Sequence, residues 1–171
     1  MDRKKTVLTL RQTVLFAMLG AFTFAAKVAM AGLPNIEPVS LFVMLFAVTF
    51  GLKALYPMYT YVALEFLFYP ANLWNINYLY IWLILALSAW GMRKVKNPVF
   101  WALLSGGFGL MFGMLCAPVD VFVGGFAYAA GKWVNGIPFD LLHGAGNFVI
   151  ALTLFVPLRT LLARLYARLQ Q

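Results

Sequence analysis

The chain has 171 residues, of which 64% are hydrophobic, 17% aromatic and only 11% charged. An ordinary soluble domain is far less apolar, so lipid must be part of the solvent of this protein. The formal net charge of +8 would suit nucleic acid if it formed one patch, but the basic residues are spread along the chain, so we expect no nucleic-acid partner.

The apolar stretches predict an all-α, polytopic membrane protein: a bundle of six transmembrane helices in one domain covering residues 1–171. A spanning helix needs about 20 mostly apolar residues, and fewer when neighbours bury its ends. The predicted helices cover residues 10–30, 39–56, 57–69, 77–92, 98–116 and 138–158. Pro57, Pro98 and Pro138 suit first-turn positions, where a missing N–H costs nothing. Residues 117–137 are expected to form a long apolar loop.

The basic residues predict the orientation of the bundle. Eleven of the 13 Lys and Arg residues lie at alternate junctions between apolar stretches, and such residues stay cytoplasmic. We therefore expect both termini in the cytoplasm and the protein in the cell membrane. The eleven are Arg3, Lys4, Lys5, Arg11, Lys53, Arg93, Lys94, Lys96, Arg159, Arg164 and Arg168.

Residues for covalent or metal chemistry are scarce. A single cysteine, Cys116, excludes an internal disulfide and a cysteine-based metal cluster. The single histidine, His143, has no second ligand at metal spacing and no serine or cysteine beside it. There is no Walker-type nucleotide motif either. We expect no enzymatic activity, no metal site and no cofactor.

Ionisable residues within the predicted spans are few, and each costs about 2.5 to 3.5 kcal/mol to insert at membrane depth. Lys27 lies near the outer end of the first helix and Glu65 lies within the third. Glu65 needs a partner, and Lys27 is the obvious candidate. A structural ion pair and contact with a ligand both remain open for them.

Asp140, His143 and Asn147 follow an i, i+3, i+7 spacing, which places them on one helical face. They form either a cap and a packed inter-helix histidine, or a polar stripe lining an outward cavity. The predicted outer connections add amides, a carboxylate and aromatic rings, the mixture that small-molecule pockets use. These residues are Asn35, Glu37, Asn72, Trp74, Asn75, Asn77, Tyr128 and Trp133.

Small residues recur every four positions in the first helix, at Ala17, Ala21 and Ala25, beside Gly20. Such a face lets another helix approach closely. It serves either packing within the same bundle or contact with another protein.

With these features the chain resembles the substrate-binding S components of energy-coupling factor (ECF) vitamin transporters. The resemblance covers nearly the whole chain and rests on the six-helix topology, the alanine face and two stretches. These stretches are LPNIEPVSLF, residues 33–42, and GIPFDLLHGAGNF, residues 136–148.

The resemblance implies a protein that captures a vitamin from outside and has no energy source of its own. It would join a transmembrane coupling protein and two cytosolic ABC ATPases, and topple in the membrane to present its ligand inside. The resemblance places docking at Ala17, Ala21 and Ala25. It places ligand binding at Asn35, Glu37, Asn77, Asp140, His143 and Asn147, whereas Lys27 is not part of the family pattern.

More than one ligand and more than one class of protein remain open. The amide-rich outer segments look most similar to the cobalamin-type S components, with queuosine precursors and other heterocycles as further ligands. One rival is a small proton-coupled carrier that uses Glu65, Lys27 and His143 as a relay. Another is an assembly factor whose alanine face serves only oligomerisation.

Overall fold

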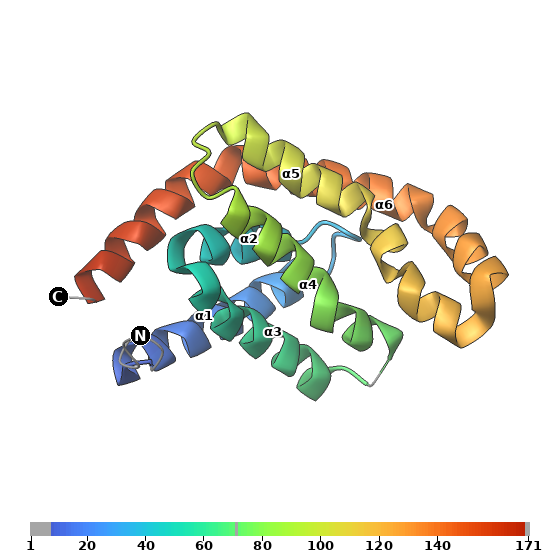
Figure 1. The fold of residues 1–171 in the computed structure, drawn as a ribbon, viewed down its shortest axis with the longest axis horizontal. Coiled ribbons are helices and arrows are strands. Elements are labelled where there is room, and N and C mark those ends of the chain that lie inside the picture. Colours follow the sequence, from blue (N-terminus) through green and yellow to red (C-terminus); the bar gives the residue numbers. More distant parts are fainter. Residues whose placement is uncertain (1–7, 71, 170–171) are drawn as a thin grey trace.

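The computed structural model describes residues 8–70 and 72–169, and the regular structure in this part of the chain is entirely helical (Figure 1). This confirms the all-α prediction. Arg3, Lys4 and Lys5 lie outside the described residues. The elements are α1 (Leu10–Ala29), α2 (Val39–Phe50), the 3₁₀ turn η2 (Gly51–Ala54), α3 (Leu55–Phe68), α4 (Leu73–Gly91), α5 (Pro98–Leu110) and α6 (Phe112–Leu169).

Four helical stretches are long and apolar enough to cross a membrane. They are Leu10–Ala29, Val39–Phe68, Leu73–Gly91 and Pro98–Leu169. The first and third match the approximately 20-residue length of one crossing, whereas the second and fourth contain bends and more than one helical segment. This length and composition suit a membrane protein.

Short polar side chains fix where several helices begin. Thr9 and Gln12 form a reciprocal capping box at the start of α1. The Asn72 side chain accepts hydrogen bonds from the backbone N–H groups of Trp74 and Asn75, so α4 begins at Leu73 instead of the predicted residue 77. Pro98 lies in the first turn of α5, as predicted, behind the capping residue Asn97.

The boundary between the second and third predicted helices moves by several residues. Gly51 has φ of 62°, a conformation that glycine adopts without strain, and it ends α2 at Phe50. The chain then makes the η2 turn and enters α3 at Leu55. Pro57 therefore lies inside the first turn of α3 and does not begin it.

The predicted loop over residues 117–137 is wrong, because this segment is helical. After a break at Met111, α6 runs to Gly125, reverses direction there and continues to Leu169. Gly125 has φ of 78° and ψ of 179°, so one glycine makes the turn. Pro138 consequently lies within a helix instead of starting one, and the predicted fifth helix ends at Leu110. We call the two arms on either side of Gly125, residues 112–137, the Gly125 hairpin.

Helix α5 packs against the later part of α6 through small residues. A Cβ atom added to Gly109 would lie 2.8 Å from the backbone nitrogen of Gly144, and one added to Gly144 would lie 2.5 Å from Cγ of Leu110. Only glycine permits backbones to approach so closely. This contact holds the segment that carries Asp140, His143 and Asn147 against the bundle.

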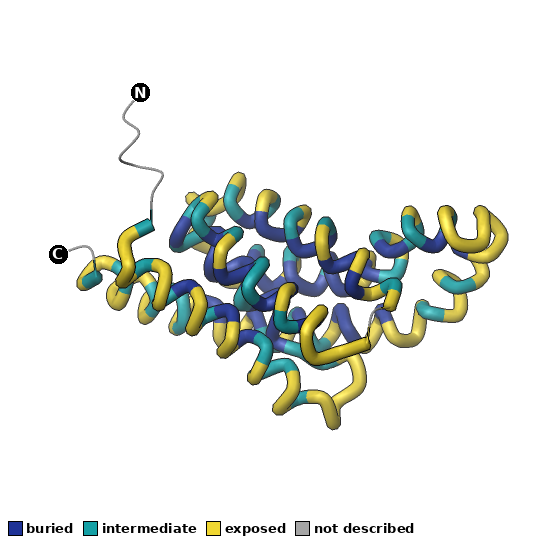
Figure 2. The backbone as a smooth tube through the Cα atoms, turned by 90° about the horizontal axis from the view of Figure 1, so that it is seen from below, coloured by how far each residue is buried: buried dark blue, intermediate teal, exposed yellow. Residues whose placement is uncertain are grey.

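Aromatic side chains fill the middle of the bundle. Trp82 and Tyr61 are completely buried and meet edge to face, with ring centroids 6.2 Å apart. Trp101 of α5 stacks on Phe155 of α6, with centroids 4.5 Å apart. Figure 2 shows the buried residues gathered in the bundle interior, whereas the Gly125 hairpin at one end is mostly exposed.

Basic side chains tie the opposite end of the molecule together. Gln12 of α1 donates a hydrogen bond to the Tyr166 hydroxyl of α6 and accepts one from Lys53. The Arg159 guanidinium donates to the carbonyl oxygens of Arg93 and Val95. We call this region the basic end. The start of α1 and the end of α6 both lie there (Figure 1).

Candidate ligand-binding site

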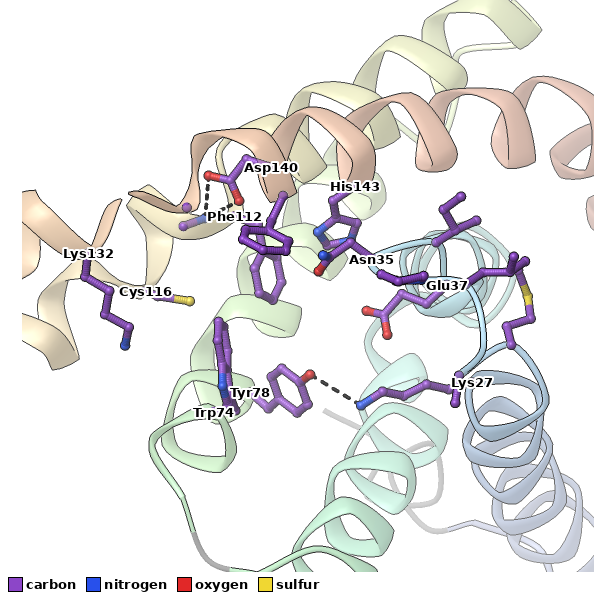
Figure 3. A pocket seen from close by; sticks show the side chains of 18 of the residues that line it. Lys27, Asn35, Glu37, Trp74, Tyr78, Phe112, Cys116, Lys132, Asp140 and His143 are labelled. Carbon is purple, nitrogen blue, oxygen red and sulfur yellow. Dashed lines mark hydrogen bonds between the residues drawn. The ribbon is translucent and has the colours of Figure 1, made fainter. Parts of the chain in front are cut away.

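A cavity of about 530 Å³ lies at the end of the bundle that carries the Gly125 hairpin (Figure 3). Its walls come from the end of α1, the α1–α2 connection, the start of α4, both arms of the hairpin and the part of α6 that follows the hairpin. The lining residues used below are Lys27, Asn35, Glu37, Tyr69, Trp74, Tyr78, Phe112, Gly113, Cys116, Asp120, Lys132, Trp133, Phe139, Asp140 and His143. Residues from distant parts of the sequence therefore meet around one space of the size that small-molecule ligands occupy.

Four of the six ligand-binding residues expected from the resemblance line this cavity. They are Asn35, Glu37, Asp140 and His143. The other two lie outside its lining and bond to neighbours. The Asn147 amide donates to the Ser40 hydroxyl of α2 at 3.0 Å, and Asn77 Oδ1 lies 3.0 Å from the Tyr80 hydroxyl.

The α1–α2 connection brings Asn35 and Glu37 to the cavity. Asn35 has φ of 56°, a left-handed conformation that asparagine tolerates better than most residues. Glu37 is half-buried, and no hydrogen bond or ion pair to its carboxylate is found within the described residues. Burial raises the pKa of Glu37 to about 6, although the nearby Lys27 charge opposes this rise. The carboxylate points into the cavity (Figure 3).

Asp140, just beyond the second arm of the hairpin, binds the start of the first arm. The backbone N–H of Gly113, in the first turn of α6, donates to both oxygens of the Asp140 carboxylate, at 3.1 and 3.2 Å. A negative charge is favoured at a helix start. Asp140 therefore caps a helix, as one of the two alternatives proposed. The helix start that it caps is that of α6, 27 residues earlier in the chain.

His143 is buried beside the cavity, one turn beyond Asp140. Its side chain lies edge-on to Phe112, with ring centroids 4.9 Å apart. The residue is only 4% exposed, and its Nε2 atom has no hydrogen-bond partner in the described part of the chain. An unpartnered buried nitrogen is costly, so a ligand that hydrogen-bonds to it would recover that cost.

Lys27 and Glu65 form an ion pair, one of the two alternatives that the sequence left open. Lys27 Nζ lies 2.8 Å from Glu65 Oε2, and the two side chains are 20% and 5% exposed. Lys27 also donates to the Tyr78 hydroxyl at 3.4 Å and lies 5.0 Å from the centre of that ring. The ammonium charge at the cavity wall is thus already matched by a buried carboxylate.

A second ion pair, Lys132 with Asp120, was missed from the sequence. Lys132 Nζ lies 2.5 Å from Asp120 Oδ1, and the Asp120 side chain is only 3% exposed. The two residues come from opposite arms of the hairpin and meet because the chain reverses at Gly125. An acid and a base at similar distances before and after that glycine are the signal that would have predicted the pair.

Aromatic rings form much of the remaining wall. Trp74 and Tyr78 lie one turn apart on α4, and Trp74 stacks on Phe112 with centroids 6.2 Å apart. Tyr78 and Phe112 were not expected at the site. Recognising Asn72 as a helix cap would have placed Trp74 and Tyr78 on one face of α4.

The alanine face of α1 lies away from the cavity. Ala17, Ala21 and Ala25 are all exposed, and in α1 only Phe16, Gly20 and Thr23 are buried. The face is therefore not used for packing within the described part of the chain.

Comparisons of the chain with protein-family models, curated proteins and solved structures found no match.

Proposed function

We propose that this protein is the substrate-binding S component of an ECF-type importer, which captures a vitamin-like solute outside the cell. The observation that carries the proposal is the cavity of about 530 Å³, built from aromatic walls and a few polar groups at one end of an apolar helical bundle. In this role the protein binds and releases its solute without chemical change.

The proposed topology has six crossings and both termini in the cytoplasm. Helices α1 to α5 would each cross once, although α2, α3 and α5 are short, and the part of α6 after the hairpin would cross last. The bonds of Gln12 and Arg159 bring α1, the α4–α5 connection and the end of α6 to one end of the bundle. That end carries Arg11, Lys53, Arg93 and Arg159, so the positive-inside rule favours placing it in the cytoplasm. The cavity would then face outward.

Delivery would require partners, namely a transmembrane coupling protein and two cytosolic ABC ATPases. Ala17, Ala21 and Ala25 would dock on the coupling protein, and the protein would topple to present the solute inside. The exposure of all three alanines supports this, because small exposed side chains let a partner helix approach closely.

Cobalamin stays the ligand predicted from the resemblance. The cavity volume favours a smaller solute, because pockets of about 300 to 1,000 Å³ suit drug-sized ligands and a corrinoid with its side arms is larger. A queuosine precursor or another heterocycle is closer to this size.

Uptake in cells tests the proposal. Cells that express this chain with an ECF coupling protein and its ATPases should accumulate the solute that co-purifies with the protein, as identified by mass spectrometry. Cells with catalytically inactive ATPases should not accumulate it. Accumulation against a gradient by this chain alone would refute the assignment.

Docking has its own test. Ala21→Trp should abolish ATPase-dependent uptake while the affinity of the purified protein for its solute stays within about twofold, since Ala21 lies outside the cavity. Leu87→Trp, at an exposed apolar position on α4, is the matched control and should leave uptake intact. Equal loss of solute binding in Ala21→Trp would point to misfolding instead.

A proton-coupled carrier is the second candidate, and the Lys27–Glu65 pair beside the cavity favours it. In that case, dissipating the proton gradient while ATP is maintained should abolish uptake. An ATP-driven importer should be unaffected.

A further inference from the structure

The acidic residues of this strongly basic chain gather around the cavity. The chain has only five acidic residues against 13 Lys and Arg. Glu37, Asp120 and Asp140 line the cavity, and Glu65 pairs with the lining residue Lys27. The fifth, Asp2, lies outside the described residues.

Both lysines at the cavity are already neutralised. Lys27 is held by Glu65 and Lys132 by Asp120, in each case by a carboxylate more deeply buried than the lysine. Four carboxylates thus face two ammonium groups, which leaves an excess of two negative charges. An anionic solute would find no free cation among these residues.

The two remaining carboxylates differ in their surroundings. Asp140 is compensated by the Gly113 N–H and the start of α6. Glu37 makes no hydrogen bond or ion pair in the described structure, and its carboxylate points into the cavity (Figure 3). The raised pKa of Glu37 agrees with this incomplete compensation.

Two further features match a positively charged, flat ligand. The buried, unpartnered His143 Nε2 lies at the cavity wall and offers a hydrogen bond to a ligand. The rings of Trp74, Tyr78 and Phe112 line the same space, and aromatic faces attract cations as well as flat apolar groups.

We propose that the cavity selects an organic cation: a positively charged nitrogen placed against Glu37, on a flat apolar body held among the aromatic rings. This rests on the proposed function only in that the cavity takes up a solute. It adds the chemical class of that solute, which the fold alone leaves open.

Three related probes of different charge test the proposal: benzyltrimethylammonium, benzyl alcohol and phenylacetate. Binding is measured on the purified 171-residue chain in nanodiscs of neutral phosphatidylcholine, so that the lipid surface does not concentrate the cation. The readout is tryptophan fluorescence, because Trp74 and Trp133 line the cavity. The cation should bind at least about tenfold more tightly than either other probe.

Variants at one position separate charge from shape. Glu37→Gln should weaken binding of benzyltrimethylammonium by about tenfold or more and leave benzyl alcohol within about twofold. Glu37→Asp, which keeps the charge, should retain most of the preference for the cation. If neither variant folds, the ranking of the probes on the unaltered protein still decides.

Several results would overturn the proposal: tighter binding of phenylacetate, equal binding of all three probes, binding of none of them, or unchanged cation affinity in Glu37→Gln. Because these measurements use no ATPase, they are independent of the transport assay. A preference for the cation without ATPase-dependent uptake would reject the transporter and keep this inference. ATPase-dependent uptake together with a preference of the cavity for anions would keep the transporter and reject this inference.

Discussion

Individual residues at the cavity divide into those that hold the wall together and those that remain free for a ligand. Lys27, Lys132 and Asp140 are committed to Glu65, Asp120 and the Gly113 N–H. Glu37 and His143 have no such partner within the described residues. The same stretch of helix thus carries a structural residue, Asp140, and a candidate ligand contact, His143, three positions apart.

Removing Lys27 should destabilise the protein. Lys27→Met leaves the Glu65 carboxylate, 5% exposed, without its counter-charge, and breaking a buried pair in this way costs about 3 kcal/mol. The double variant Lys27→Met with Glu65→Gln should recover part of that loss, because the uncompensated charge is gone. Unfolding in mixed micelles with increasing SDS measures both. A double variant no more stable than Lys27→Met would show that the ion pair is not the cause.

The stability of the unliganded protein should depend on the ionisation of Glu37. Its pKa is raised from 4.5 to about 6 by burial, so the folded state binds the proton more tightly than the unfolded chain does. The resulting stabilisation is fully present below pH 4.5 and is lost as the pH rises through about 6; it amounts to roughly 2 kcal/mol.

Unfolding measured between about pH 4 and about pH 8 checks this as the difference between the unaltered protein and Glu37→Gln. Other titrating groups cancel in that difference. A difference that does not change with pH would contradict the assignment of the raised pKa to Glu37.

At the residue scale, the sequence indicated Lys27 as the partner of Glu65, because a carboxylate within an apolar span needs a counter-charge, and the two residues form an ion pair. Four of the six residues that the resemblance places at the pocket line one cavity. The other two bond to residues outside the cavity lining, Asn77 to Tyr80 on its own helix and Asn147 to Ser40 of α2. Nothing in the local sequence indicates that Asn147 bonds to Ser40, 107 residues earlier.

At the scale of elements, the Gly125 hairpin departs most from the sequence prediction. Residues 117–137 are rich in glycine and aromatic residues, which favoured a loop, yet only Gly125 leaves the helical conformation. Prolines are tolerated in membrane helices, where neighbouring groups satisfy the freed backbone. The composition of the segment therefore gave a wrong prediction, because a single residue, Gly125, determines where the chain turns.

Replacing Gly125 should loosen the hairpin. Its φ of 78° and ψ of 179° belong to a region that is essentially restricted to glycine, so Gly125→Ala should cost about 1–3 kcal/mol and separate Lys132 from Asp120. Gly131→Ala is the matched control, because a Cβ atom there meets nothing within 4 Å and alanine favours a helix.

Trypsin cleavage after Lys132 reports the change. Cleavage should be faster in Gly125→Ala than in the unaltered protein, and unchanged or slower in Gly131→Ala. Equal rates in all three proteins would mean that the turn does not depend on glycine.

At the scale of the whole molecule, the sequence predicted the helical class and the meeting of distant segments better than the number and ends of helices. Apolar length and basic junctions are properties of the entire chain, and they predict a bundle that suits a membrane. The ends of the helices depend on single residues, such as the cap Asn72 and the helix-ending Gly51. One such residue is hard to recognise within a long apolar sequence.

Cysteine labelling tests the proposed orientation. In a Cys116→Ala background, Leu33→Cys should react with a membrane-impermeant maleimide in intact cells, because residue 33 lies at the cavity end. Lys96→Cys, in the α4–α5 connection, should react only after the membrane is opened. Labelling of Lys96→Cys in intact cells would show that the α4–α5 connection lies outside the cell and would contradict the proposed orientation.

The aromatic middle of the bundle restricts how a solute can cross. Between the cavity and the basic end lie the completely buried rings of Trp82 and Tyr61 and the Trp101–Phe155 stack. Opening a channel there would expose several large side chains, and each costs about 1.5 to 3 kcal/mol to bring out of an apolar environment. If the protein carries a solute across the membrane as proposed, a rigid-body reorientation of the whole protein would therefore avoid the cost of opening a pore through this aromatic layer.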